Sequence, residues 1–545
     1  MVSVSAGGAA RGVRAGPFEA TADRCRAASL QWGRDSKAIW LKFLKFLKLK
    51  MMISSLTSKR TFVAPSGGPS TRLRHGSRPA VWSTVQWGLG VWSLASLRRS
   101  RTAVRAAEWV AGAQDDREFQ SFAEYKAELE ANGRLPEGFR LASSSLSFVP
   151  EEAEGIGKSE MRLTVICLDE PTERVAAVFT QNAFPGAPVK LGKRRLAEKQ
   201  AIQAVVVNNK ISNVSPPDAD GGISASETIC AELAKNLGLE SANQVLPSST
   251  GVIGWRLPVK EMVSALPKKD ELKEANAVTA AEGIMTTDRY PKLSSQDFDR
   301  GRLVGIAKGA GMIEPNMATM LCFLMTDVDL PREDLQKMLS EAVQDTFNLI
   351  SVDGDESTSD TVVLLSSGAA GPVDPELFQK ALKESCRDLA AQVVRNGEGT
   401  QHVIRVAVSG ADSDEVARRV GKAVVNGPLF KSAIAGNDPN VGRLIGKVGQ
   451  ALGAKGAKMA EGCTFKLGGE TIFQDGQFRL DTAKEKRLSD HLKFAAANST
   501  LGYPEHRRVV DVEVILAGGS GPGAAVVLGS DLTTEYVEIN ADYRS

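Results

Sequence analysis

Histidine is scarce in this sequence, which narrows the classes of enzyme that it could encode. Four histidines occur in 545 residues, and one of them, His75, lies near the N-terminus. The other three are His402, His491 and His506, and none lies in a motif that supports a Ser-His-Asp or Cys-His centre. Catalysis by a histidine base is therefore disfavoured.

Closely spaced cysteines are also missing. The six cysteines lie far apart, with no CxxC spacing that would suggest a zinc site or a redox motif. Their scatter does not suit a disulfide framework either, so the sequence fits a reducing compartment and predicts no metal centre. The cysteines are Cys25, Cys167, Cys230, Cys322, Cys386 and Cys463.

Acidic residues are nearly absent from residues 1–107, which hold nineteen Lys and Arg but only three acids. The net charge is therefore +16 in this region and −14 in the remainder, although the whole chain sums to +2. An acid-poor, Arg- and Ser-rich N-terminal region is typical of organellar transit sequences. We predict a basic targeting region at 1–107 and an organellar matrix or stroma as its destination. The segment 62–79, flanked by apolar stretches, favours a plastid over a mitochondrion.

Two other interpretations of this region stay open. Met51 and Met52 could each start a chain, which would make the preceding residues an untranslated leader. A basic arm could also bind nucleic acid, but no recognisable binding module follows it, so no nucleic-acid partner is predicted. The apolar stretch 81–97 is short and contains several polar residues, which argues against a permanent membrane span.

The rest of the chain has the composition of a globular protein, with 42% hydrophobic and 24% charged residues overall. A charged, helical linker is predicted at 108–139, and the folded body at 140–545. β-branched alternating runs and amphipathic runs come in mixed order, which favours a layered α+β sandwich over a doubly wound sheet. Strands are expected at 161–169, 174–182, 201–209, 402–410, 507–519 and 523–532, and helices at 224–239, 331–350 and 374–397.

Two glycine-rich stretches do not predict nucleotide binding. Residues 518–525 follow a strand, but the next residues are strand-like, so the helix N-terminus that would hold a pyrophosphate is missing. Residues 442–449 contain a Gly-Lys pair with the wrong spacing for a P-loop, and no Ser or Thr follows Lys447. We interpret the first stretch as a turn and expect no phosphate site in the second.

The segment 308–327, KGAGMIEPNMATMLCFLMTD, changes abruptly from a loop to an apolar run. The glycines, Pro315 and Asn316 disfavour regular structure, whereas the residues from Thr319 onward read as a buried interior strand. In an arbitrary protein, Thr319 would simply be a β-branched residue that follows a turn.

The Ala318–Thr319 junction also suits a specific chemistry. The Thr319 hydroxyl could attack the Ala318 carbonyl, and water would then cleave the resulting ester. The freed α-amine of Thr319, with a pKa near 8, could afterwards act as the base that activates the same hydroxyl. This mechanism needs no histidine.

Four ordered motifs resemble those of the ornithine acetyltransferase (glutamate N-acetyltransferase) family of arginine biosynthesis. Residues 305–327 resemble the family's self-cleaving segment, 248–258 its oxyanion segment and 284–292 its Thr-Thr-Asp motif. The C-terminal residues 536–545 resemble the family's C-terminus, and 352–361, 395–404 and 436–444 agree more weakly. The resemblance covers roughly residues 140–545.

The resemblance assigns roles to individual residues. It implies cleavage between Ala318 and Thr319, with Thr319 as the nucleophile, and an oxyanion hole made by the Thr250 hydroxyl and the Gly251 N–H. Two donors aimed at the developing alkoxide are what acyl transfer requires. The substrate-binding positions implied by the resemblance are Thr287, Lys308, Thr319, Glu398, Asn540 and Ser545.

The resemblance also implies a fold, a reaction and an assembly. The fold is a layered α/β structure of the self-cleaving N-terminal-nucleophile type, with an α chain at 140–318 and a β chain at 319–545. The acetyl group of N2-acetylornithine would pass to glutamate through an acetyl-Thr319 ester, without metal or organic cofactor. The two cleaved chains are expected to stay associated, commonly as a heterotetramer. Some members also use acetyl-CoA as donor, and the sequence leaves that activity open.

One segment departs from the family pattern, and two alternatives remain. Residues 208–222, NNKISNVSPPDADGG, lack the family's usual glycine pattern and contain inserted residues, which puts substrate preference or efficiency in question. A self-processing aminopeptidase or amidase of related architecture would resolve the acyl-enzyme with water instead of glutamate. An uncleaved, non-catalytic paralogue is the second alternative, and the intact 308–327 segment argues against it.

Overall fold

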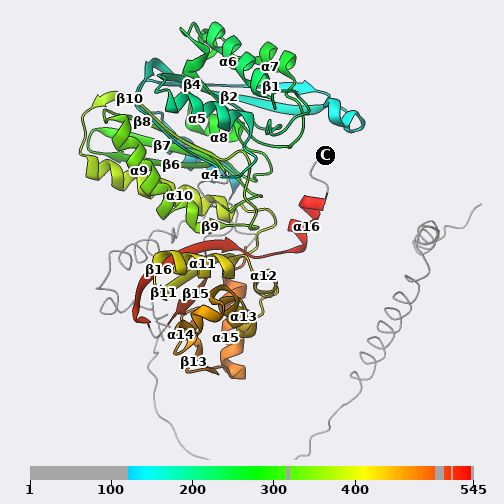
Figure 1. Ribbon diagram of the computed structural model, residues 1–545, viewed down its shortest axis with the longest axis vertical. Coiled ribbons are helices and arrows are strands. Elements are labelled where there is room, and N and C mark those ends of the chain that lie inside the picture. Colours follow the sequence, from blue (N-terminus) through cyan, green and yellow to red (C-terminus); the bar gives the residue numbers. More distant parts are fainter. Residues whose placement is uncertain (1–118, 120, 315–319, 498–507, 517–518, 542–545) are drawn as a thin grey trace, which may run out of the picture. The chain divides into compact units, whose positions relative to one another are not determined.

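The computed structural model describes residues 119, 121–314, 320–497, 508–516 and 519–541 (Figure 1). All of them belong to the second of the two units into which the chain divides, residues 88–545. The predicted targeting region 1–107, the Ala318–Thr319 bond and Ser545 lie outside the described residues.

The first sheet has four strands in the order β1-β2-β4-β5. β1 and β2 pair antiparallel, as do β2 and β4, whereas β4 and β5 run parallel. The apolar run of β4 is buried on both faces, as expected of an interior strand. The strands span Phe139–Phe148 (β1), Ser159–Thr172 (β2), Ile202–Asn208 (β4) and Val245–Ser249 (β5).

The second sheet has five strands in the order β3-β10-β8-β7-β6. β8 (Leu321–Val328) lies in the middle, parallel to β10 and antiparallel to β7, and all eight of its residues are buried. The prediction of an interior strand after Thr319 is therefore confirmed for the described residues. The other strands span Val175–Phe179 (β3), Thr361–Gly371 (β10), Gly301–Lys308 (β7) and Lys292–Phe298 (β6).

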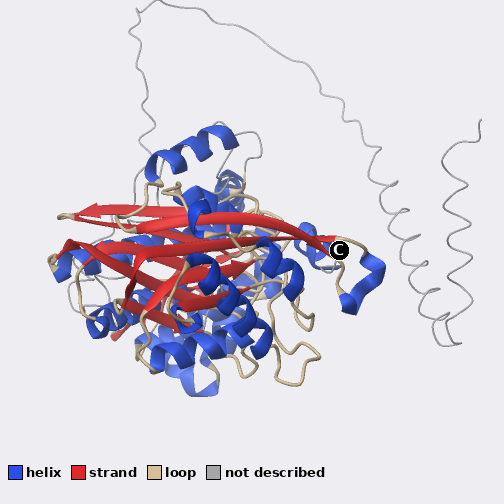
Figure 2. Cartoon of the chain, turned by 90° about the horizontal axis from the view of Figure 1, so that it is seen from above, coloured by secondary structure: helices blue, strands red, loops and turns tan. Residues whose placement is uncertain are grey.

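The two sheets form a sandwich that is covered by helices on both outer faces (Figures 1 and 2). Side chains such as Ile166 and Val205 of the first sheet meet Phe323 and Val304 of the second in one core cluster. Helices α6 (Ile223–Leu237) and α7 (Val259–Ala265) cover the first sheet, and α9 (Arg332–Asp345) and α10 (Pro375–Arg395) cover the second. This four-layer arrangement confirms the predicted α+β sandwich.

A third sheet of seven strands follows in the order β14-β13-β12-β15-β11-β16-β9. Its strands are β9 (Ile350–Ser351), β11 (Val403–Gly410), β12 (Thr464–Leu467), β13 (Glu470–Gln474), β14 (Gln477–Phe478), β15 (Val509–Ile515) and β16 (Gly521–Ser530). One face packs on α11 (Asp414–Val425), α12 (Pro428–Ala435), α13 (Val441–Leu452) and α15 (Thr482–Ala495). Val403 and Leu528, on the other face, join the core cluster that contains α10.

Shorter elements complete the described chain. The remaining helices are α4 (Phe122–Asn132), α5 (Ala187–Ala197), α8 (Ala277–Gly283), α14 (Ala457–Ala460) and α16 (Thr534–Ala541). Short 3-10 helices span Glu151–Ile156, Ala242–Gln244, Lys269–Glu271, Phe347–Leu349 and Ala454–Gly456. Within these described ranges, every helix is too short or too polar to traverse a lipid bilayer.

Several local predictions can be compared with the structure. The predicted linker 108–139 contains α4, whose Tyr125 and Leu129 are buried in the core between the two sheets. Residues 442–449 lie inside helix α13, where their backbone is not a phosphate-binding loop. In α10 the helical spacing of Leu377, Ala381, Leu389 and Val393 predicts one apolar face. This prediction is wrong at the first turn, because Leu377 is 43% exposed and Phe378 is buried in its place.

Candidate active site

A cavity of about 110 Å³ lies beside the facing ends of β7 and β8. Lys308 is the last residue of β7 and pairs with Leu321, the first residue of β8. Met320, which follows Thr319 in the chain, is buried and also lines the cavity. Six of the residues predicted for the site line it together, namely Thr250, Gly251, Thr287, Lys308, Glu398 and Asn540.

Thr250 and Gly251 form the turn that follows β5. Gly251 has a φ of +116°, and a Cβ at this position would lie 2.1 Å from the Lys210 carbonyl oxygen, so only glycine fits. Among the described residues, no acceptor is hydrogen-bonded to the Gly251 N–H or to the Thr250 hydroxyl. The turn therefore presents two adjacent donors to the cavity, as an oxyanion hole requires.

The segment that departs from the family pattern packs directly behind this turn. The Asn208 side chain accepts hydrogen bonds from the N–H groups of Lys210 (3.3 Å) and Ile211 (3.0 Å). The Lys210 carbonyl in turn accepts a 2.9 Å hydrogen bond from the Val252 N–H. Ser212 of the same segment lines the cavity, so residues 208–222 both support and border the candidate oxyanion hole.

The Lys308 side chain is half-buried beside three carboxylates. No described residue accepts a hydrogen bond from its ammonium group, although Asp288, Asp360 and Glu398 act on it electrostatically. Burial lowers the pKa of Lys308, and the attraction of these carboxylates offsets that effect only in part. An under-coordinated cation at a cavity wall is suited to binding a carboxylate of a ligand.

Glu398 connects two other predicted residues. Its Oε1 accepts a 2.6 Å hydrogen bond from the Thr287 hydroxyl, and its Oε2 accepts a 2.7 Å hydrogen bond from Asn540 Nδ2. The Glu398 N–H donates to the Ala310 carbonyl at 2.9 Å. Gly311 allows this approach, because a Cβ there would lie 2.3 Å from Glu398 Oε2. A carboxylate held in this way can bind the amine of a substrate.

A buried ion pair lies behind these residues. Lys292, fully buried, contacts Asp288 and donates a 2.8 Å hydrogen bond to Asn396 Oδ1. Asp288 also accepts hydrogen bonds from the N–H groups of Thr286 (2.9 Å) and Gly309 (2.8 Å). The pair therefore ties the 286–288 loop to the chain that follows Lys308.

Comparison with known proteins assigns the chain to a family. The model of the ArgJ family matches residues 150–545. The chain belongs to the ArgJ family.

Relatives from several organisms agree with this assignment. The arginine biosynthesis bifunctional protein ArgJ of Rhodococcoides fascians is 35% identical over 413 residues, which cover 75% of this chain and 94% of the relative. A protein of Methanosarcina mazei named glutamate N-acetyltransferase is 38% identical and covers 72% of this chain and 96% of its own length. The crystal structure of the Bacillus halodurans ArgJ protein, 34% identical, aligns with 40% of this chain and 97% of its own, at a TM-score of 0.35. The prediction of an acyltransferase of arginine biosynthesis is confirmed at the family level.

Sequence reasoning missed part of the cavity wall of this ArgJ-family chain. Ile253 and Met312 line the cavity, as does a run of hydroxyl and carboxyl side chains, residues 357–360. The buried pair Asp288–Lys292 was missed as well. The run 357–360 and the pair Asp288–Lys292 lie within 352–361 and 284–292, which resemble family motifs. The motifs alone do not say which of their residues face the cavity.

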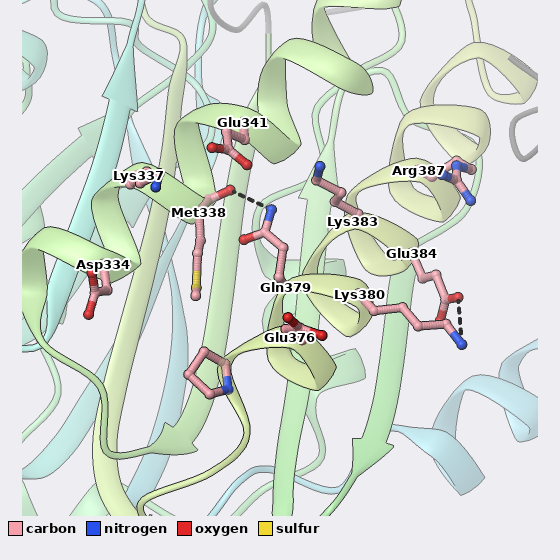
Figure 3. Close-up of a pocket in the computed structure, with 11 residues that line it drawn as sticks. Asp334, Lys337, Met338, Glu341, Glu376, Gln379, Lys380, Lys383, Glu384 and Arg387 are labelled. Atoms are coloured by element: carbon pink, nitrogen blue, oxygen red, sulfur yellow. Dashed lines mark hydrogen bonds and ion pairs between the residues drawn. The ribbon is translucent and has the colours of Figure 1, made fainter. Parts of the chain in front are cut away.

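A larger hollow of about 570 Å³ lies between α9 and α10 and contains none of the predicted site residues (Figure 3). Its wall is formed by long side chains of both charges, including Lys337, Glu341 and Lys383. Gln379 Nε2 bridges the helices with a 3.4 Å hydrogen bond to the Met338 carbonyl. Among the residues that the structure describes, no group of three or more His, Cys, Asp and Glu is placed to hold a metal ion.

Proposed function

We propose that this chain is a glutamate N-acetyltransferase that transfers the acetyl group of N2-acetylornithine to glutamate through an acetyl ester on Thr319. The observation that carries the proposal is that residues as distant as Thr250 and Asn540 border one small cavity with Met320, the neighbour of Thr319. The cavity offers a cation, a carboxylate and two donors for which no described residue supplies an acceptor. These are the groups that an acetylated amino acid requires for binding and acyl transfer.

The first step of the proposal is self-cleavage. The Thr319 hydroxyl oxygen attacks the carbonyl carbon of Ala318, and the peptide C–N bond breaks to leave an ester and a free α-amine. Water then hydrolyses the ester, which gives a carboxylate on Ala318 and restores the hydroxyl on Thr319. The new α-amine serves as the base for the later acyl transfer.

Acetyl transfer then follows in two half-reactions. The Thr319 hydroxyl attacks the acetyl carbonyl while its α-amine takes the proton, and the Thr250 hydroxyl and Gly251 N–H stabilise the oxyanion. The intermediate collapses, the proton passes to the departing amine, and ornithine leaves an acetyl ester on Thr319. The amine of glutamate attacks this ester, forms N-acetylglutamate and returns the hydroxyl. The reaction needs neither a metal nor an organic cofactor.

The site suggests how the amino-acid part of each substrate is held. Lys308 would bind a substrate carboxylate, and Glu398, positioned by Thr287 and Asn540, would bind an amine. Ser545 is proposed to complete the site. Acetyl-CoA is proposed as an additional acetyl donor to be tested, because some members of the family use it.

The proposal extends to assembly and location. The two cleaved chains, 140–318 and 319–545, are proposed to remain associated and to form a heterotetramer. The basic, acid-poor region 1–107 is proposed to direct the protein to an organellar matrix or stroma, of a plastid in preference to a mitochondrion. Fusion of residues 1–107 to a fluorescent protein tests the destination, and retention in the cytosol would contradict it.

One experiment separates the main alternatives. Denaturing electrophoresis with N-terminal sequencing should find a fragment beginning TMLCFLMTD, and Thr319→Ala should give a single uncleaved chain. Active enzyme that stays intact would overturn the proposed nucleophile. Without glutamate, purified enzyme should release ornithine from N2-acetylornithine for one turnover only. With glutamate, the release should continue. Continuous release without glutamate would instead identify a hydrolase of the aminopeptidase or amidase type.

A further inference from the structure

Asp353 lies in the loop that follows β9 and holds the cavity wall from behind. Its Oδ2 accepts a 2.7 Å hydrogen bond from the Met312 N–H, and its Oδ1 accepts a 2.8 Å hydrogen bond from the Ile313 N–H. The Val352 N–H donates to the Ile313 carbonyl at 2.7 Å. Three hydrogen bonds therefore attach residues 312–313 to residues 352–353.

The attached segment has an unfavourable backbone conformation. Met312 has a φ of +55°, although it is not a glycine, and this left-handed conformation is unfavourable for a residue with a Cβ. Met312 and Gly311 both line the candidate active site. Since the carboxylate of Asp353 binds two successive N–H groups at this turn, it offsets the strain and fixes the cavity wall.

The same carboxylate also binds the C-terminal helix α16. Tyr536 Oη donates a 3.2 Å hydrogen bond to Asp353 Oδ2. Burial and the adjacent carboxylates raise the pKa of Tyr536 well above its usual value, so its phenol stays protonated and acts as the donor. One helical turn later, Asn540 Nδ2 donates to the Tyr536 carbonyl at 3.0 Å and to Glu398 Oε2 at 2.7 Å.

Helix α16 depends on such polar contacts because none of its residues is buried. Apart from the bonds of Tyr536 and Asn540, its described contacts include an ion pair between Arg289 and Glu535. Just before the helix, Thr533 Oγ1 donates to the Gly399 carbonyl at 2.7 Å. A helix without an apolar anchor is positioned by its few polar contacts, so loss of one contact should displace it.

We propose that Asp353 is a positioning residue that joins the cavity wall at 311–313 to helix α16, and thereby holds Asn540 and Glu398 in place for the substrate amine. The inference rests on the proposed function for its kinetic consequence. The physical link itself, from Met312 through Asp353 and Tyr536 to Asn540, is independent of which acyl compound binds.

Tyr536→Phe tests the link with the smallest change, because it removes the phenol oxygen and keeps the ring. The KM for N2-acetylornithine should rise about tenfold, in line with the loss of a hydrogen bond to a charged group, while kcat changes less than threefold. The fragment that begins at Thr319 should still form. Tyr125→Phe is the matched control, since it removes a 2.8 Å hydrogen bond to the Pro291 carbonyl, which is not part of the link from Met312 to Asn540. It should lower Tm without changing KM.

Asp353→Asn extends the test to both sides of the link. One amide oxygen cannot replace the two carboxylate oxygens that bind Met312, Ile313 and Tyr536, so the KM should rise more than in Tyr536→Phe. The double variant with Asp353→Asn and Tyr536→Phe should have a KM less than twofold above that of Asp353→Asn alone, because both changes break the same link. Independent, additive effects would overturn the inference.

Hydrogen exchange gives a readout that needs no substrate. In Tyr536→Phe, backbone amides of α16 and of residues 312–313 should exchange faster, whereas those of β8 should not change. If wild-type enzyme transfers no acetyl group but exchange rises as expected, the proposed function fails and the link stands. If wild-type enzyme is active but exchange and KM are unchanged in the variant, the link is refuted.

Discussion

Thr287 and Glu398 lie 111 residues apart in the sequence, yet the Thr287 hydroxyl donates a 2.6 Å hydrogen bond to Glu398 Oε1. This bond joins the loop before β6 to the loop after α10 across the candidate active site. Asn540 binds the other carboxylate oxygen at 2.7 Å, so Glu398 is held from two directions. A carboxylate restrained in this way loses little freedom when it binds a substrate amine.

Replacement of Thr287 by valine should therefore impair the enzyme without unfolding it. Thr287→Val keeps the β-branched shape but removes the donor to Glu398, and kcat/KM for N2-acetylornithine should fall about 10- to 100-fold. Thr228→Val is a suitable control, because its hydroxyl binds only the Ser224 carbonyl on the exposed surface of α6. Equal kinetic losses in the two variants would contradict a specific role for Thr287.

The turn at Gly251 should tolerate no side chain. Gly251→Ala would place a Cβ 2.1 Å from the Lys210 carbonyl and displace the N–H from the cavity, and kcat should fall at least about 100-fold. Gly254→Ala, three residues later, is the matched control: its φ is +87°, but a Cβ there meets no atom within 4 Å. Steady-state kinetics should show a kcat within a few-fold of wild type for Gly254→Ala. A comparable loss in both variants would point to backbone strain alone.

Lys308 should contribute to binding at the expense of stability. Burial lowers the pKa of Lys308, which means that its surroundings disfavour the charged form. Lys308→Met should raise the KM for N2-acetylornithine and for glutamate more than about 100-fold, yet leave Tm unchanged or higher. Calorimetry and kinetics on the same preparation test this combination. A large fall in Tm with nearly normal KM values would show that Lys308 serves the fold and not the ligand.

The buried pair of Asp288 and Lys292 should make the protein sensitive to acid. Burial raises the pKa of Asp288, but Lys292, Lys308 and the Gly309 N–H outweigh this effect and bring it to about 2. Because the folded pKa lies below the unfolded value, Asp288 stabilises the fold above pH 4, by about 2 kcal/mol, and this contribution disappears between about pH 4 and pH 2.

Chemical denaturation between pH 2 and pH 6 measures this dependence. A double variant, Asp288→Asn with Lys292→Met, should show a shallower loss of stability in acid than wild type, because the titrating carboxylate is gone. An identical pH profile in the two proteins would assign the acid sensitivity to other groups.

Much of the fold could be predicted because burial leaves periodic patterns in the sequence. The eight buried residues of β8 were visible as an apolar run. Helix α9 was visible as a helical spacing, although the predicted helix 331–350 runs past Asp345, where α9 ends. The first turn of α10 was mispredicted because the spacing of Leu377 fits the buried stripe, while its neighbour Phe378 faces the core. A helix that begins at the edge of a sheet can rotate its apolar stripe by one residue, and the pattern alone does not fix that choice.

The residues of the candidate site could be predicted for a different reason, because they lie in motifs that resemble those of a family. Thr287, Lys308 and Glu398 lie in such motifs, whereas each taken alone would be read as a surface residue. Tyr536 and Asp353 could not be paired beforehand, because they are 183 residues apart and their contact leaves no periodicity. The side chains behind a site have to be found in three dimensions.

The strand order of the second sheet has a consequence for a backbone cut before residue 319. Strands β3, β6 and β7 precede the cut and β8 and β10 follow it, while the order in the sheet is β3-β10-β8-β7-β6. Strands β10 and β8 of the second polypeptide would thus lie between β3 on one side and β7 on the other, which both belong to the first polypeptide. Because β8 and β10 would belong to one polypeptide and their neighbours β3 and β7 to the other, we expect the sheet to form before any such cut. The two polypeptides would stay together in the native protein and would separate only when the chains are denatured.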